Sequence, residues 1–163
     1  MKIIHVTGRQ NSGKTTLIVD LIEELTSRGL RVGTLKHTPH EHELDKPGKD
    51  SYRHRAAGAD PAACVTAGLM AVYMPKKKDE DPFDRISELF RDTDLVIVEG
   101  YIDRPGTKIE VWRKETGTAP IFTEREASIR AVITDDPIET DLPVWPRNNI
   151  PGLTDNILDM LEI

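Results

Sequence analysis

The chain has 163 residues and a formal net charge of −6, from 22 Lys and Arg against 28 Asp and Glu. This length suits one domain over residues 1–163, because single domains usually span about 100 to 200 residues. The acidic balance argues against a nucleic-acid partner, which needs a dominant basic face. No apolar run approaches the roughly 18 residues of a membrane span. The lone Cys64 cannot form an internal disulfide, so we expect a cytoplasmic protein without a membrane partner.

The first predicted elements are a strand, a loop and a helix. Residues 3–6 are apolar and β-branched, and a glycine-rich segment follows them. Apolar residues then recur at helical spacing up to Leu25, and Gly29 is typical of a helix end. Residues 30–35 predict a second strand, placed as a βαβ unit requires.

A long functional loop is expected over residues 36–55, where charges and four of the five histidines replace the apolar periodicity. Within it, Asp50 is expected to cap a short helix that ends at Gly58. Residues 62–66 and 69–74 predict two short strands.

The second half of the chain continues the alternation of helices and strands. A helix is expected to start at Asp81 and to bury one apolar face, formed by Phe83, Ile86, Leu89 and Phe90.

Two strands of buried type are predicted at residues 95–98 and 131–133, because both are uninterrupted apolar runs. Residues 108–113 alternate apolar and polar side chains and predict a more peripheral strand. The last helix is expected to begin near Pro151 and to bury Leu153, Ile157, Leu158 and Leu161.

Residues 8–15 read Gly-Arg-Gln-Asn-Ser-Gly-Lys-Thr and match the P-loop pattern between a predicted strand and a predicted helix. The glycines let backbone amides turn toward phosphate oxygens, and the helix adds the positive end of its dipole. Lys14 is expected to reach the β- and γ-phosphates, and Thr15 to bind Mg²⁺. The nucleotide-binding candidates here are Gly8, Asn11, Ser12, Gly13, Lys14 and Thr15. The fold expected is an α/β P-loop NTPase with a mostly parallel sheet flanked by helices and some antiparallel or peripheral strands.

Acidic partners for Mg²⁺ are expected at the carboxyl ends of neighbouring strands. Glu99 ends the apolar strand and is the first candidate, although Asp is the usual residue there; with Lys14 it forms the candidate catalytic pair. Asp45 and Asp50, in the long loop, are further metal-side candidates. Lys49 and its basic neighbours suggest an anion site, with a solvated surface as the alternative.

The histidine cluster leaves a second reading open. His40 and His42 could bind a transition metal through their imidazoles, but no second cysteine is present and the spacing matches no zinc pattern. Surface histidines or phosphate contacts are the alternative.

The base of the nucleotide has one candidate partner. Asp135 follows the strand at residues 131–133, and its carboxylate could accept hydrogen bonds from guanine N1 and N2. The Asn-Lys-x-Asp guanine signature is absent, and Asp135 could instead begin the turn at Pro137.

Taken together, these segments resemble the molybdopterin-guanine dinucleotide biosynthesis protein B family, the P-loop adaptor proteins of molybdenum cofactor maturation. The resemblance is carried by residues 8–15, 33–38, 94–100 and 108–111, and most specifically by residues 45–55, Asp-Lys-Pro-Gly-Lys-Asp-Ser-Tyr-Arg-His-Arg.

The resemblance implies GTP binding with Mg²⁺, weak GTP hydrolysis, a homodimer, and partnership with the guanylyltransferase that joins GMP to molybdopterin. The molybdopterin precursor is a further candidate ligand. By the same resemblance, Thr16 joins the phosphate contacts and Glu99 lies near the metal. Asp45, Lys49 and Asp50 become candidates for switching or partner contact.

Two other functions remain open at this stage. One is a small-molecule kinase on the same P-loop, and the other is a metal-delivery GTPase that uses the histidines. The sequence shows no evident catalytic base beyond Glu99 and no assigned arginine finger, so we expect at most a slow Mg²⁺-dependent GTPase. Arg53, Arg55 and Arg104 are candidates for the missing cation.

Overall fold

The computed structural model describes residues 1–78, 80–124 and 128–163. Its contacts divide the chain into two compact units. The first, here called the sheet unit, comprises Met1–Thr38 and Leu89–Ile163, and the second, the hairpin unit, comprises Pro39–Glu88. Each unit is described by itself. The prediction of a single domain stays a prediction.

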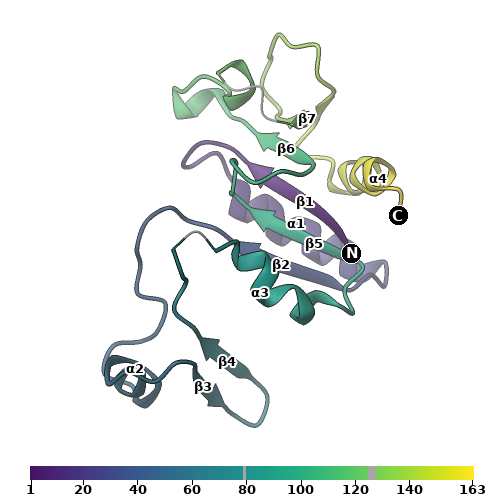
Figure 1. The fold of residues 1–163 in the computed structure, drawn as a ribbon. Coiled ribbons are helices and arrows are strands. Elements are labelled where there is room, and N and C mark those ends of the chain that lie inside the picture. The colour runs from purple at the N-terminus through teal and green to yellow at the C-terminus, as the bar shows by residue number, and fades with distance from the viewer. Residues whose placement is uncertain (79, 125–127) are drawn as a thin grey trace. The chain divides into compact units, whose positions relative to one another are not determined.

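The sheet unit is built on six strands in the order β2-β5-β1-β6-β7-β8, and every neighbouring pair is parallel (Figure 1). The strands are β1 (Lys2–Thr7), β2 (Val32–Lys36), β5 (Leu95–Glu99), β6 (Lys108–Val111), β7 (Ile129–Ile133) and β8 (Val144–Trp145). The mostly parallel α/β fold expected from the sequence is confirmed.

Two helices of this unit, α1 (Lys14–Ser27) and α4 (Ile150–Leu161), contact each other and β1. Both are amphipathic, and each turns a leucine- and isoleucine-rich stripe toward the sheet. The stripes interlock with the facing strand residues in one apolar core, whose buried helical members are Leu17, Ile18, Leu21, Leu25, Leu153, Ile157 and Leu161.

The position of strand β6 corrects one prediction. β6 was expected at the periphery, but it lies between β1 and β7 and all four of its residues are buried. Its polar side chains are compatible with burial because each has partners. Lys108 Nζ donates to Ser128 Oγ at 3.0 Å, and Glu110 accepts two backbone N–H groups. The alternation of polar and apolar side chains along β6 therefore reflects one polar and one apolar face of the strand, both of which are buried.

The hairpin unit contains α2 (Asp50–Ala56), β3 (Ala62–Val65), β4 (Met70–Tyr73) and α3 (Pro82–Ile86). β3 and β4 are the two short strands predicted from the sequence, and they pair with each other antiparallel. The short helix is also present, but Lys49 is its cap residue and Asp50 is its first helical residue.

The helix expected from Asp81 is shorter than predicted. Asp81 does cap it, because its carboxylate accepts a hydrogen bond from the Phe83 amide at 2.9 Å. The α-helix ends at Ile86, and Ser87–Phe90 continue as a tighter 3-10 turn. A 3-10 helix has about three residues per turn instead of 3.6, so the side chains after Ile86 no longer follow the α-helical spacing on which the prediction was based. Leu89 is consequently 75% exposed, and the expected apolar face does not extend to it.

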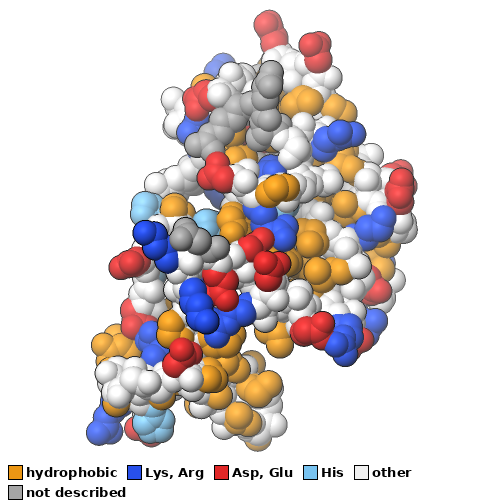
Figure 2. Space-filling model, viewed as in Figure 1, with side chains coloured by type: hydrophobic (Ala, Val, Ile, Leu, Met, Phe, Trp, Pro, Cys, Tyr) orange, Lys and Arg blue, Asp and Glu red, His pale blue; other side chains and the backbone are white. Residues whose placement is uncertain are grey.

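The two faces of the β3–β4 hairpin differ in character. Cross-strand pairs on one face are Ala62 with Tyr73 and Cys64 with Ala71. The alternate positions form the other face, here called the outer face, and consist of Ala63, Val65, Met70 and Val72. Its three large members are exposed, and hydrophobic side chains gather over the hairpin in the space-filling view (Figure 2).

Within the described parts of the chain, we find no helix with the length and apolar character that crossing a membrane would require.

Candidate functional site

The P-loop connects β1 to α1, as the sequence predicted. Gly8 and Gly13 have φ values of +144° and +90°, a region that favours glycine. A Cβ on Gly8 would lie 2.4 Å from the carbonyl oxygen of Val111, at the end of β6. The loop therefore passes too close to the neighbouring strand for any other residue.

The N-terminus of α1 has no side-chain cap. The N-termini of α3 and α4 do, from the Asp81 carboxylate and from the Asn149 side chain, which accepts from the Gly152 amide at 3.2 Å. Uncapped amides at a helix N-terminus attract an anion. Ser12 adds a buried hydroxyl with no hydrogen-bond partner among the described residues. The loop is thus built to receive an outside acceptor.

The ammonium of Lys14 folds back on the loop. Its Nζ donates to the carbonyl oxygens of Gly8 at 2.9 Å and Arg9 at 2.6 Å. Burial lowers the pKa of Lys14 from its ordinary value of 10.5; the negative charge of Glu99 opposes this shift and the positive charge of Lys36 adds to it. A phosphate placed here would replace the carbonyls and favour the charged form.

Glu99 lies at the carboxyl end of β5, between the P-loop and β2. Its Oε1 accepts hydrogen bonds from Thr15 Oγ1 at 2.8 Å and from Lys36 Nζ at 3.1 Å. Thr15 and Glu99, both predicted as metal-side residues, are therefore brought together. A hydroxyl and a carboxylate oxygen are the ligand types that suit Mg²⁺.

These groups line one open pocket of about 520 Å³. Its lining residues are Gln10, Asn11, Gly13, Lys14, Thr15, Thr16, Lys36, Glu99 and Arg113. Asn11, Thr16 and Gly13, predicted to bind nucleotide, are all among them.

Arg113 is a site residue that sequence reasoning missed. A Cβ on Gly13 would lie 3.5 Å from its guanidinium, so this cation stands beside the N-terminus of α1. Its Nη1 also donates to Glu115 at 2.9 Å. Arg113 follows β6, which pairs with β1 on the side opposite to β5. Glu99 was predicted because it lies at the carboxyl end of a strand, and the same reasoning applied to β6 would have indicated Arg113.

A second pocket of about 180 Å³ adjoins the same arginine. It is lined by Val111, Trp112, Arg113, Glu115, Ile133, Thr134, Asp135, Asp136 and Arg147. Asp136 accepts a hydrogen bond from the Lys114 amide at 2.8 Å, and Asp135 Oδ1 accepts one from the Asn148 amide at 3.2 Å. Asp135, the predicted base partner, thus lies in a pocket that shares Arg113 with the phosphate loop.

A buried acid fixes the segment beyond this pocket. Glu110 on β6 accepts backbone hydrogen bonds from Ile121 at 2.6 Å and Phe122 at 3.0 Å. Burial raises the pKa of Glu110 above its ordinary value of 4.5, and the two amide bonds oppose that shift. The same segment meets the P-loop, because Arg9 pairs with Glu124.

The remaining predicted residues belong to the hairpin unit. Asp45, Lys49 and Asp50 line a separate pocket of about 340 Å³ between the start of α2 and the β3–β4 hairpin. Asp45 is buried, whereas the side chain of Asp50 is 88% exposed and faces Arg53 at 3.7 Å. Their predicted metal and nucleotide roles remain predictions.

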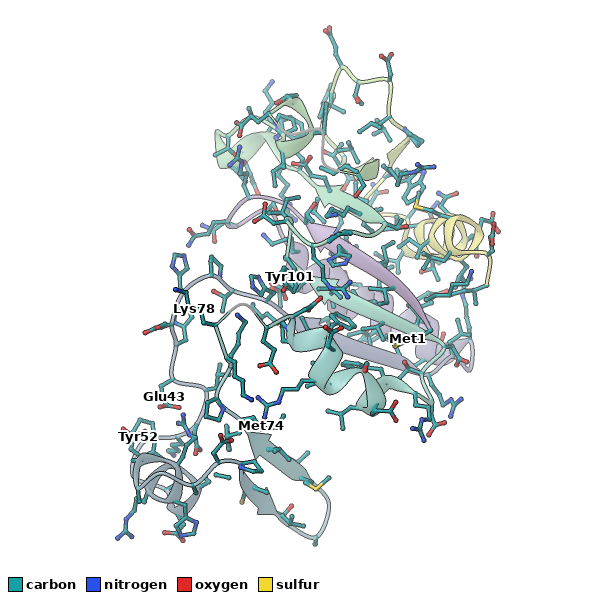
Figure 3. All side chains as sticks on the ribbon, viewed as in Figure 1. Met1, Glu43, Tyr52, Met74, Lys78 and Tyr101 are labelled. Carbon is teal, nitrogen blue, oxygen red and sulfur yellow. The ribbon has the colours of Figure 1, made fainter. Side chains whose placement is uncertain are left out.

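The histidines do not form a metal cluster in the part of the chain that the structure describes, where no group of three or more His, Cys, Asp or Glu side chains could hold an ion. His40 and His42 have ring centroids 6.0 Å apart. His37 stacks on Tyr101 with centroids 3.9 Å apart; Tyr101 is labelled in Figure 3.

With this geometry established, comparison with known proteins assigns the family. The family model of MobB, described as molybdopterin guanine dinucleotide synthesis protein B, matches residues 3–135. The chain belongs to the MobB family. The predicted resemblance is confirmed, and with it a place in molybdopterin guanine dinucleotide synthesis.

Individual MobB relatives agree over nearly the whole chain. A molybdopterin-guanine dinucleotide biosynthesis adapter protein of Haemophilus influenzae is 36% identical over 162 residues, covering 98% of this chain and 89% of its own. The Escherichia coli protein of the same name is 36% identical over 155 residues, covering 93% and 88%. The crystal structure of Bacillus subtilis MobB superposes with a TM-score of 0.77 at 31% identity, covering 99% of this chain and 98% of its own.

Proposed function

We propose that this MobB-family protein is a GTP-binding adapter that assists attachment of GMP to molybdopterin, with at most slow Mg²⁺-dependent GTP hydrolysis. The observation that carries the nucleotide assignment is the P-loop, whose glycine geometry, uncapped helix and inward Lys14 form one open pocket. The adapter role is supported by the names of the relatives from H. influenzae and E. coli.

Guanine preference is supported by the pocket beyond Arg113. Asp135 Oδ1 has one backbone donor, at 3.2 Å, and a carboxylate offers about four lone-pair sites. Guanine presents two adjacent N–H donors on its N1 and N2 edge, whereas adenine has an acceptor at N1. Arg113 lines both pockets, so a single nucleotide can lie with its phosphates at the loop and its base toward Asp135.

Slow hydrolysis follows from the partners of the candidate catalytic groups. Glu99 accepts hydrogen bonds from Thr15 and Lys36, and Arg113 pairs with Glu115. With Mg²⁺ bound, Thr15 and Glu99 would hold the ion and the ion would neutralise charge on the phosphates. A free base that could activate water is missing from the described lining of this pocket.

A homodimer is part of the proposal, and the outer face of the hairpin supports it. Val65 and Met70 are 71% and 66% exposed, and Val72 is 48% exposed. A two-stranded sheet with one unpartnered apolar face gains stability when that face is covered. Sedimentation velocity of wild type and Val65→Lys tests this: we expect a dimer that the variant weakens. An unchanged dimer in the variant would remove the outer face from the proposal.

Binding of GTP and ATP, with and without Mg²⁺, tests the nucleotide assignment. We expect GTP preference, Mg²⁺ dependence and a loss of about 100-fold or more in affinity in Lys14→Ala, because a phosphate loses a charge-assisted hydrogen bond. Lys2→Ala is the matched control, since Lys2 lies at the far end of β1 and contacts Glu162. Equal ATP binding would overturn the guanine assignment.

Adding the protein to a molybdopterin guanylyltransferase reaction tests the adapter role. We expect a complex between the two proteins and a faster reaction in the presence of GTP. The absence of both a complex and a rate change would overturn the adapter role while leaving GTP binding in place.

A further inference from the structure

The pocket of the hairpin unit has no role in the nucleotide site described above. Its floor comes from the inner face of the hairpin, where Cys64, Ala71 and Tyr73 lie on adjacent positions of β3 and β4. Its wall comes from the start of α2, with Lys49 at the helix cap. A volume of about 340 Å³ falls at the lower end of the range of about 300–1,000 Å³ for small-molecule sites.

One buried carboxylate in this pocket is only half used. Asp45 is 8% exposed, and its Oδ1 accepts hydrogen bonds from the Lys46 amide at 2.7 Å and from Ser51 Oγ at 3.2 Å. Oδ2 is buried and accepts no hydrogen bond of ordinary geometry from the described residues. The Tyr73 hydroxyl faces this carboxylate, and burial together with the negative charge of Asp45 raises the pKa of Tyr73. A buried acceptor without a donor is costly, so the site favours a ligand that brings N–H groups.

The surrounding side chains are fixed in place. Arg55 stands over the Tyr73 ring at 5.5 Å from its centroid and over the Tyr52 ring at 5.7 Å, and it pairs with Glu43. Glu43 and Tyr52 lie close together in Figure 3. Glu43 also accepts from the Asp45 amide at 2.8 Å. Tyr73 and Asp45 are therefore held by one network, as a preorganised site requires.

A metal ion is the less suitable occupant. The other acid of the lining, Asp50, is 88% exposed at its side chain and faces Arg53. The described residues include no cluster of three or more His, Cys, Asp or Glu that could hold an ion. A flat ring with N–H donors suits the apolar floor, the tyrosine and the single open oxygen better.

We propose that this pocket binds an amino-oxopyrimidine ring, the ring shared by the pterin and the guanine of molybdopterin guanine dinucleotide, with Asp45 accepting its N–H groups. The inference rests on the proposed function for its choice of ligand. Lys49 also lines the pocket, and its positive charge would attract a phosphate attached to such a ring. This gives the segment at residues 45–55 a ligand of its own, separate from the phosphate loop.

Fluorescence anisotropy of neopterin, a fluorescent pterin, tests the inference on the full-length protein. We expect binding to wild type and to Lys14→Ala alike, and about 10- to 100-fold weaker binding to Asp45→Asn, because a charge-assisted hydrogen bond is lost. Asparagine keeps an oxygen for the Lys46 amide and Ser51. Ala71→Leu, which adds bulk to the floor and leaves the Asp45 carboxylate unchanged, is expected to weaken binding as well, and circular dichroism checks that both variants are folded.

Competition distinguishes the two sources of the ring. Displacement of neopterin by guanosine at similar concentration would identify a guanine site, and failure of guanosine to compete would identify a pterin site. Lumazine, which has a carbonyl in place of the amino group, is expected to compete poorly with either. No neopterin binding at millimolar concentration, or binding that neither variant changes, would overturn the inference. GTP binding that still depends on Lys14 would in that case leave the proposed function intact.

Discussion

The two units of the molecule are stabilised in different ways. The sheet unit has a continuous apolar core in which the strand and helix residues are at most 7% exposed. In the hairpin unit, only Asp45, Ala62 and Phe83 are buried among the described residues. Polar contacts around Arg55 and Asp45 connect its elements instead. The phosphate loop therefore rests on a well-packed apolar core, whereas the hairpin unit depends on its polar contacts for stability.

The strongest test of this difference removes apolar side chains from both units. Leu21, on α1, is fully buried, and Leu69, in the hairpin, is 72% exposed. We expect Leu21→Ala to lower the free energy of unfolding by about 2–5 kcal/mol, because it leaves a cavity. Leu69→Ala is expected to change it by less than about 0.5 kcal/mol. Urea denaturation followed by circular dichroism measures both, and equal losses would contradict the comparison.

The buried carboxylate of Glu110 is a polar group that we expect to contribute to the stability of the sheet unit. Glu110→Ala removes the acceptor of the Ile121 and Phe122 amides, and buried donors without a partner cost about 1–3 kcal/mol. We expect that loss in urea denaturation. Glu115→Ala, at an acid whose side chain is 72% exposed, is the control and should have little effect.

The pH dependence of stability gives Glu110 a second signature. Its pKa is raised in the folded protein, so the unfolded chain loses this proton first as pH rises. The unfolded state then binds fewer protons, and the wild type loses stability from about pH 4.5 up to the raised pKa. Glu110→Gln cannot ionise and should lack this component. A wild-type curve that rises through the same range, with no difference from the variant, would contradict the assignment.

The P-loop and the buried strand β5 could be predicted because both are local patterns. The glycine spacing of residues 8–15 and the apolar run of β5 decide them without knowledge of distant contacts. The position of β6 could not be predicted, since Glu110 alternates like a surface residue. Its partners Ile121 and Phe122 lie eleven and twelve residues away, and no sequence pattern connects them. The two-residue β8 is too short to leave any pattern.

Within the site, sequence order explains what was found and what was missed. Glu99 was found because it ends an obvious strand, and Arg113 was missed because β6 was placed at the periphery. For Asp45, the sequence indicated an acid in a functional loop. The burial of Asp45 and its hydrogen bond from Ser51 could not be predicted, because only the three-dimensional structure brings Asp45 together with Ser51 and the hairpin.

A smaller effect is expected from the network of the hairpin unit. Arg55→Ala removes the ion pair with Glu43 and the contacts with the Tyr52 and Tyr73 rings, which together contribute about 1 kcal/mol. Hydrogen exchange should show faster opening of α2 and β3, and no change in β5. Arg31→Ala, which removes a 3.9 Å ion pair with Asp94 in the sheet unit, is the matched control. Equal acceleration in β5 would mean that the two units open together.

The smallest expected effect is a fraction of a proton taken up when GTP binds. Burial lowers the pKa of free Lys14, so part of the population is neutral in the alkaline range below 10.5. Phosphate favours the ammonium and raises the pKa again, so binding takes up protons, and affinity falls as pH rises through the lowered value. Calorimetry in buffers of different ionisation enthalpy measures this uptake.

Lys14→Arg provides the control for this measurement, because a guanidinium stays charged at every pH used. We expect the variant to bind GTP more weakly and without proton uptake in the alkaline range. Equal uptake in Lys14→Arg would assign the proton to another group. If the wild type takes up no proton when GTP binds, the Lys14 ammonium is already fully charged in the free protein. Burial in the sheet unit would then not lower the pKa of Lys14 enough to affect GTP binding.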